Sequence, residues 1–293
     1  MLPGQRLDYG DVYGSWLAPL RGRFRRVTRN LVLATVHNAD PFDDWTWVIA
    51  NWTVLARAAR DAGLAGILFD NEPYAERLWH WPDEVDYPYT LPAYQFRYRL
   101  RGRELMQALR ATWPDITVMV LHGPYLSDAR TLPGVTNGQG VGDASDLSGH
   151  LFVGLVRGSG GTAGVVDGGE VYQYRTPQDF ATSYAWRKQQ LPQLPAPAAG
   201  RPLIPPRMQA DWPRQVSIGF GLYDLAWKPG YPMDPGILRS TLANALARAD
   251  DLVWLFTEGG GPHQYLVPGG VDPAWLDAIA AARGLPAGLG RRH

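Results

Sequence analysis

The sequence contains no cysteine at all. Disulfide bonds, thiolate zinc sites and cysteine nucleophiles are therefore excluded, and the redox compartment stays open. Lysine is almost absent too, occurring only at positions 188 and 228, and 28 acidic residues balance 28 lysines and arginines. A balanced charge argues against a nucleic-acid binder, which should show a basic excess, and against a polybasic membrane anchor. We therefore expect neither nucleic acid nor a membrane as a partner.

Long apolar runs are also missing. No stretch approaches the roughly 20 apolar residues that a membrane-spanning helix needs. The first six residues contain no apolar signal-peptide core. The chain is thus expected to be either cytoplasmic, or secreted or periplasmic with its signal already removed, and the sequence does not choose between them.

Several cofactor and metal motifs are absent. No Gly-x-Gly-x-x-Gly follows the first predicted strand, and the glycine-rich turn at 158–161 is not followed by Gly-Lys-Ser/Thr. There is no Gly-x-Ser-x-Gly nucleophile elbow. The six histidines are scattered, without His-x-His or His-Glu-x-x-His. We expect no cofactor and no metal, with a metal-dependent hydrolase kept as an alternative because strand-end His and carboxylates can also bind metal.

One short apolar run, residues 66–69, ends directly in acid. Such a run is typical of a strand covered on both faces. Asp70 and Glu72 follow it, and residues two apart on a strand point the same way, so both carboxylates can face one cleft. Paired acids at the C-terminal end of a strand indicate a (β/α)-barrel active site. The alternative is that Asp70 caps the next segment and Glu72 is solvated.

Strand and helix patterns alternate along the chain, which predicts a parallel α/β architecture. Helices are predicted at 45–62, 93–112, 147–156, 177–190, 236–249 and 273–283, and strands at 31–36, 65–70, 116–121, 163–167, 216–222 and 252–257. We expect one (β/α) TIM-type barrel domain over residues 1–293, incomplete or irregular at the N-terminus because a closed barrel needs eight strands. The rival is an open doubly wound sheet.

Polar residues cluster where predicted strands end. The set comprises His37, Asn38, Asp70, Glu72, His122, Asp167, Glu170, Asp224 and Glu258. In a parallel barrel these ends share one rim, so the residues are expected around a common pocket. The long loop 71–92 adds aromatic side chains, which stack on the apolar faces of sugar rings as well as filling cores.

Several carboxylates around an aromatic cleft suit glycoside hydrolysis. That reaction uses one protonated acid for the leaving oxygen and a second carboxylate as nucleophile or base. The acid must be kept neutral by burial or by a nearby like charge. The sequence predicts such a carboxylate pair. The distance between the two carboxyl groups, which distinguishes retaining from inverting enzymes, can be measured only in a structure.

The chain resembles the glycoside-hydrolase-like (β/α)8 proteins of bacteria, a largely uncharacterised group. The matching pieces are Pro-Phe-Asp-Asp-Trp at 41–45, Gly-Ile-Leu-Phe-Asp-Asn-Glu-Pro-Tyr at 66–74, Val-Asp-Gly-Gly-Glu at 166–170 and Val-Trp-Leu-Phe-Thr-Glu at 253–258. The resemblance implies a barrel glycosidase. Asp70 and Glu72 also look like the Asp-x-Glu strand end of chitinase-like hydrolases, although positions 66 and 68 are Gly and Leu, not the earlier Asp residues of that motif.

We assign Glu72 as general acid/base and Glu258 as nucleophile or base, with Asp70 tuning Glu72 and Glu170 in reserve for either role. Hydrogen bonds to sugar hydroxyls are expected from His37, Asn38, Tyr74, His122, Asp167 and Tyr172, and stacking from Trp79, Trp81 and Trp227. The expected partner is a carbohydrate substrate. A barrel that binds carbohydrate without cleaving it remains the second alternative, and the sequence leaves the oligomeric state open.

Overall fold

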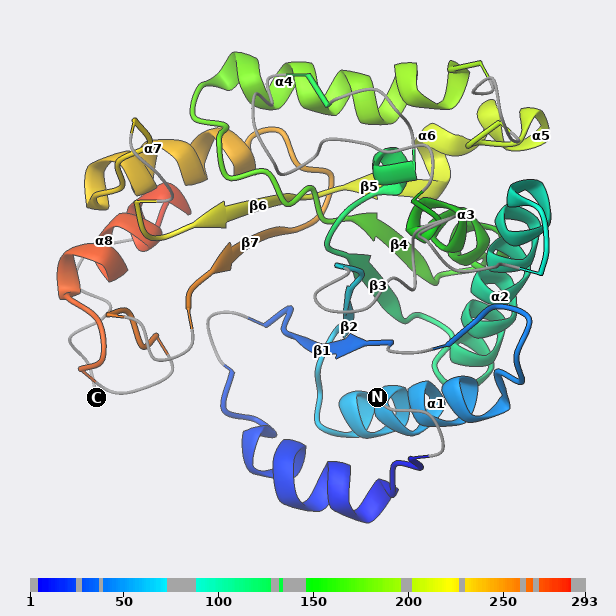
Figure 1. The fold of residues 1–293 in the computed structure, drawn as a ribbon. Helices are drawn as coiled ribbons and strands as arrows, with labels where there is room; N and C mark the ends of the chain where they lie inside the picture. The colour runs from blue at the N-terminus through cyan, green and yellow to red at the C-terminus, as the bar shows by residue number, and fades with distance from the viewer. Residues whose placement is uncertain are drawn as a thin grey trace.

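The computed structural model describes residues 5–24, 28–36, 39–72, 88–127, 132–133, 146–195, 202–226, 230–258, 262–265 and 269–285. Strands and helices alternate through this part of the chain, and the helices lie around the outside of the strands (Figure 1). The predicted parallel α/β architecture is confirmed.

The strands form two parallel sheets, and the chain passes directly from the last strand of the first sheet into the second sheet. One sheet has the order β1-β2-β3-β4-β5, and β6 pairs in parallel with β7. The strands are β1 (Leu31–Thr35), β2 (Gly66–Asp70), β3 (Thr117–Val120), β4 (Gly164–Asp167), β5 (Val216–Ile218), β6 (Phe220–Tyr223) and β7 (Val253–Phe256).

The predicted strand 216–222 is divided in two at Gly219. Its first half, β5, pairs with β4, and its second half, β6, pairs with β7. The amide of Gly219 donates to the Asp167 carbonyl at 2.7 Å, and the amide of Phe220 donates to the Leu252 carbonyl at 3.3 Å. The chain therefore changes partner at the glycine, which connects the five-stranded sheet to β7.

The longer helices occupy the predicted positions. They are α1 (Thr46–Asp61), α2 (Leu91–Thr112), α3 (Ser148–Gly158), α4 (Pro177–Ala185), α7 (Pro235–Leu246) and α8 (Pro273–Ala282). Three of them begin with a capping residue followed by proline. Proline suits the first helical position because the backbone amide that it lacks would have no acceptor within the helix. Thr176, Asp234 and Asp272 accept backbone amide hydrogen bonds at the starts of α4, α7 and α8.

Two stretches contain more helix than the sequence predicted. No helix was predicted in residues 1–29, yet Asp11–Leu17 is π-helical and Ala18–Leu20 is a 3-10 turn. No helix was predicted in the proline-rich connection 191–215 either, yet it contains a 3-10 turn (Leu191–Gln193) and the short helices α5 (Pro206–Gln209) and α6 (Trp212–Gln215). Trp186–Gln190 continues α4 as a π-helical turn.

Side chains from the five-stranded sheet and from the region of β7 share an inner cluster. Met119, Val166 and Leu252 are its buried members, with Leu31, Leu68 and Trp254 packed against them. Just before the N-terminal ends of β1 and β7, Arg29 forms an ion pair with Asp251, which connects the two segments that lead into these strands. Among the described residues no strand pairing joins β1 to β7, so a complete TIM barrel is not established.

Alternation along each strand separates the inner cluster from a larger outer core between strands and helices. Ile67 and Phe69 of β2 belong to the outer core, whereas Leu68 faces inward. Asp70 therefore lies on the inner side of the strand, at its C-terminal end. The described helices include none with the length and apolar character needed to cross a membrane.

Candidate active site

The segments after β2, β3 and β4 are held side by side by backbone hydrogen bonds that continue beyond the strands. The amide of Leu121 donates to the Phe69 carbonyl at 2.9 Å, and the amide of Glu170 donates to the Leu121 carbonyl at 3.2 Å. Parallel strands end at one edge, and these bonds carry that alignment into the loops. Residues 72, 122 and 170 are consequently neighbours, although almost 100 residues separate the first from the last.

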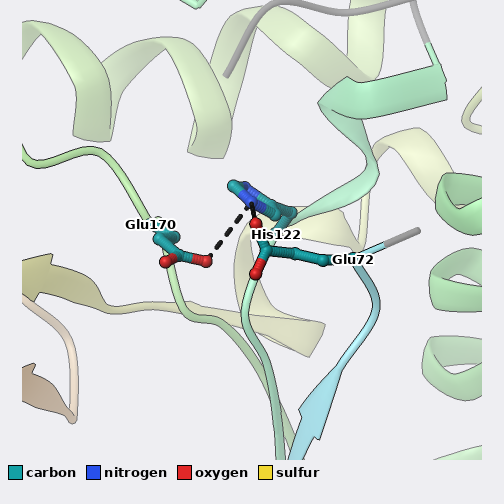
Figure 2. A group of neighbouring side chains, drawn as sticks. All are labelled: Glu72, His122 and Glu170. Carbon is teal, nitrogen blue, oxygen red and sulfur yellow. Dashed lines mark ion pairs between the residues drawn. The ribbon is translucent and has the colours of Figure 1, made fainter. Parts of the chain in front are cut away.

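His122 lies between two carboxylates (Figure 2). Its Nε2 atom is 3.6 Å from Glu72 Oε1 and 3.3 Å from Glu170 Oε2. The side chains of His122 and Glu170 are 5% and 7% exposed, whereas that of Glu72 is 28% exposed. Glu72 is thus the accessible member of an otherwise buried group, which we call the Glu72–His122–Glu170 cluster.

Two buried neighbours fix the position of His122. The Asn71 side chain accepts from the His122 amide at 3.0 Å and donates to the His122 carbonyl at 3.1 Å. The hydroxyl of Tyr125 lies 3.3 Å from Nδ1. With the backbone held by Asn71 and Nδ1 occupied by Tyr125, the other ring nitrogen is directed at the two carboxylates.

The predicted partner of Glu72, Asp70, is buried just before it. Its Oδ1 atom accepts a hydrogen bond from the Glu72 amide at 3.0 Å. The charge of Asp70 also raises the pKa of Glu170, after burial and the charge of Glu72. Asp70 therefore shapes the loop that carries Glu72 and adds negative charge to the cluster.

Burial and charge together raise the pKa values of His122 and Glu170. Burial alone lowers the pKa of His122, but its contact with Glu72 and the charges of Glu170 and Asp167 outweigh that effect and raise it. Burial raises the pKa of Glu170, and the charge of Glu72 raises it further, while His122 partly opposes the shift. Both shifts favour keeping a proton within the cluster near neutral pH.

Aromatic rings connect this cluster to the strand ends of β6 and β7. The Tyr172 hydroxyl donates to Glu170 Oε1, and the Tyr172 ring lies 5.3 Å from that of Tyr223 and 6.1 Å from that of Phe256. The Tyr223 hydroxyl donates to Glu258 Oε1 at 2.7 Å, and burial together with Glu258 raises the pKa of Tyr223 to about 12. Glu258 itself is exposed.

Asp167 lies elsewhere than predicted. On β4 it alternates with Val166, so it faces the outer core rather than the inner side. It is 1% exposed, and its Oδ1 atom is 2.9 Å from Nη1 of the fully buried Arg187. We therefore reassign Asp167 from substrate binding to supporting the loop that carries Glu170.

Two glycines make this arrangement possible. Gly169 has φ +59°, and a Cβ there would lie 2.3 Å from Arg187 Nη1. A Cβ on Gly123 would lie 2.2 Å from Asp167 Oδ2. Both positions therefore need glycine because the buried ion pair fills the space that a larger residue would occupy.

Six predicted binding residues lie outside the described part of the chain: His37, Asn38, Tyr74, Trp79, Trp81 and Trp227. Their predicted roles stay predictions. Asp224, another strand-end acid, is fully buried, and its Oδ2 atom lies 2.9 Å from His263 Nδ1.

Sequence reasoning missed four residues around the cluster: Asn71, Tyr125, Arg187 and Tyr223. Asn71 and Tyr125 stand one and three residues from predicted site residues, so their proximity was the only available signal. Arg187 follows Asp167 by 20 positions and lies in a predicted helix, where nothing marks it as a buried partner.

The cluster also has the composition of a metal-binding group. One atom each from Glu72, His122 and Glu170 can be chosen so that all three lie within 4.8 Å of one another. The sequence predicted no metal because no short motif was present, whereas these three residues come from three separate strand ends. Comparisons of the chain with protein-family models and with curated proteins find no match.

Proposed function

We propose that the protein is a glycoside hydrolase that cleaves glycosidic bonds in an oligo- or polysaccharide, with the strand ends forming the active site of a glycoside-hydrolase-like (β/α) barrel. The observation that carries this proposal is the position of Glu72, an accessible carboxylate directly beside the buried His122 and Glu170. A carboxyl group in such surroundings can hold a proton and deliver it to a leaving oxygen.

In this proposal Glu72 is the general acid/base. It protonates the glycosidic oxygen as the bond to the anomeric carbon breaks. Glu170, whose Oε2 atom is buried, acts through His122 and Glu72 as a positioning residue rather than on substrate. Glu258 supplies the second carboxylate, which either attacks the anomeric carbon or deprotonates the attacking water. Tyr223 orients it.

The arrangement of the strands supports a barrel. Inner side chains from β1, β2, β3, β4 and β7 share one cluster, the helices lie outside, and the acidic residues stand at the C-terminal strand ends. Function concentrates at that rim in such barrels. The exposed Phe256, which packs against the buried rings of Tyr172 and Tyr223, provides aromatic surface near Glu258, of the kind on which sugars stack.

The test is hydrolysis of a panel of aryl glycosides and oligosaccharides by the Glu72→Gln and Glu258→Gln variants. Each should lose about 10²- to 10⁴-fold in kcat/KM while keeping its fold. Glu104→Gln is the matched control, because Glu104 lies on α2 and pairs with Arg101. Full turnover by both site variants would contradict the assignment.

Leaving-group dependence distinguishes the two carboxylates. A substrate with a very acidic leaving group needs no proton, so Glu72→Gln should retain its cleavage far better than that of an alkyl glycoside. Glu258→Gln should impair both substrates equally. If the wild-type protein binds oligosaccharides but cleaves none of them, the second alternative, a non-catalytic carbohydrate-binding barrel, is correct instead.

A further inference from the structure

The Glu72–His122–Glu170 cluster has an unusual spacing for a set of hydrogen-bonded ions. Charge-assisted N–H···O bonds are about 2.7–2.9 Å long. The distances from His122 Nε2 to the two carboxylate oxygens are 3.3 and 3.6 Å. Ligands held about 2.1 Å from a tetrahedral metal ion are separated from each other by about 3.4 Å, which follows from the bond lengths and the tetrahedral angle. The two distances from His122 Nε2 are close to two edges of such a tetrahedron, and the chosen atoms of all three residues lie within 4.8 Å of one another.

A second observation concerns Glu170. Its side chain is 7% exposed, and its Oε2 atom has no hydrogen-bond partner within the described part of the chain. This oxygen is directed at His122 Nε2 (Figure 2). A buried carboxylate oxygen normally has a donor or a metal to compensate for its lost hydration. The other oxygen, Oε1, already accepts from Tyr172.

The surroundings of His122 suit a metal ligand. A ligating histidine usually engages its second nitrogen with a polar group that fixes the ring, and here Tyr125 lies 3.3 Å from Nδ1. Asn71 fixes the backbone of the same residue through two hydrogen bonds. The three ligands follow three adjacent strands, so their positions are set before any ion binds.

We infer that Glu72, His122 and Glu170 bind one divalent transition-metal ion of the zinc type, leaving a fourth position open. Two carboxylates balance the charge of a dication, and the imidazole favours zinc over magnesium or calcium, which prefer oxygen ligands. The ion takes the place of the proton shared by the three side chains, because metal binding requires deprotonated ligands.

The test is isothermal titration of the metal-free protein with zinc chloride, without substrate. We expect one equivalent to bind, and magnesium chloride to give no comparable heat. Glu72→Gln should bind zinc at least about 100-fold more weakly, because one ligand of three is weakened. Glu104→Gln should bind like the wild type. His122→Gln should also lose the site, and because Glu72 is partly exposed, its variant remains informative even if His122→Gln fails to fold.

Equal zinc binding by the wild type and Glu72→Gln, or no binding by the wild type, would overturn the inference. The inference does not rest on the proposed hydrolysis, because binding is measured with the metal alone. If both proposals hold, zinc and the catalytic proton compete for Glu72, and saturating zinc should abolish cleavage. Cleavage that requires zinc would retain this site but replace the proposed function with metal-dependent hydrolysis.

Discussion

The strand ends of β2, β3 and β4 differ sharply from those of β6 and β7. In the first region, ionisable side chains are buried against each other: His122 and Glu170 are almost inaccessible, and Glu72 alone reaches the surface. In the second region, Glu258 and Phe256 are exposed, and Glu258 accepts a hydrogen bond from Tyr223. The same rim thus carries a buried half, around His122 and Glu170, and an open half, where Glu258 and Phe256 are exposed.

The two halves have different parts in the proposed chemistry. Charges interact more strongly where water is excluded, and in the buried half they raise the pKa values of His122 and Glu170. Exposed aromatic surface is instead suited to contact with a ligand. The stability of the buried half therefore depends on compensation of charge, whereas substitutions in the open half should change the stability of the protein less. Variants that remove matched groups from each half test this distinction.

The largest expected effect comes from the ion pair beneath the buried half. Arg187→Met should destabilise the protein by about 3–5 kcal/mol, because it leaves the Asp167 carboxylate buried without its partner. Arg187 also donates to the Gly219 carbonyl at 2.8 Å, at the point where β5 becomes β6. Denaturant unfolding monitored by circular dichroism gives the difference.

The double variant Asp167→Leu/Arg187→Met is the control for that prediction. Replacing both charges with apolar groups of similar size removes the unpaired charge, so much of the lost stability should return. A single Arg187→Met variant as stable as the wild type would show that the pair does not hold the loop of Glu170.

A matched pair of tyrosines compares the two halves directly. Tyr172→Phe removes the donor to buried Glu170 and should cost roughly 1–3 kcal/mol, because a buried carboxylate oxygen loses its hydrogen bond. Tyr223→Phe removes the donor to exposed Glu258, where water can replace it, and should cost less than about 1 kcal/mol. Equal unfolding free energies for the two variants would remove the distinction between the halves.

Asp250 and Asp251, two adjacent acids just before β7, form contacts at the N-terminal end of the strands, and their variants measure how much those contacts stabilise the protein. Asp250 accepts from Lys188 at 2.6 Å, from the Ile218 amide at 2.8 Å and from Tyr184 at 2.8 Å. Asp250→Asn should cost roughly 1–2 kcal/mol. Asp251→Asn should cost no more than about 1 kcal/mol, since its partner Arg29 is a surface residue.

The pH dependence of the Asp250 effect has a definite sign. Burial alone would raise the pKa of Asp250, but Lys188, the Ile218 amide and Tyr184 lower it overall. Its stabilisation is therefore fully present above the unfolded pKa of about 3.9 and is lost as the pH falls through the folded value. Unfolding free energies of the wild type and Asp250→Asn should converge below about pH 4, and a constant gap would contradict this account.

Much of the fold could be predicted because strands and helices alternate with clear apolar patterns. The positions of Glu72, His122 and Glu170 at three successive strand ends followed from the same pattern. The break at Gly219 could not be predicted, because the sequence does not reveal that the strand changes partner from β4 to β7.

The remaining errors arise from contacts between distant residues. Asp167 looked like another strand-end acid, but its alternation with the inward-facing Val166 and its pairing with Arg187 show that it faces the outer core. Glycines and a proline at positions 10, 14 and 19 obscured the helical segment that begins at Asp11. In each case local sequence preference was overridden by tertiary packing.

Glu72, His122 and Glu170 are expected to act as one cluster that retains a proton. NMR titration of the His122 ring in metal-free buffer tests this expectation. We expect a pKa above the ordinary histidine value, because the two carboxylates outweigh burial, and a lower pKa in both Glu72→Gln and Glu170→Gln. A His122 pKa below the ordinary value in the wild type, unchanged in both variants, would contradict it.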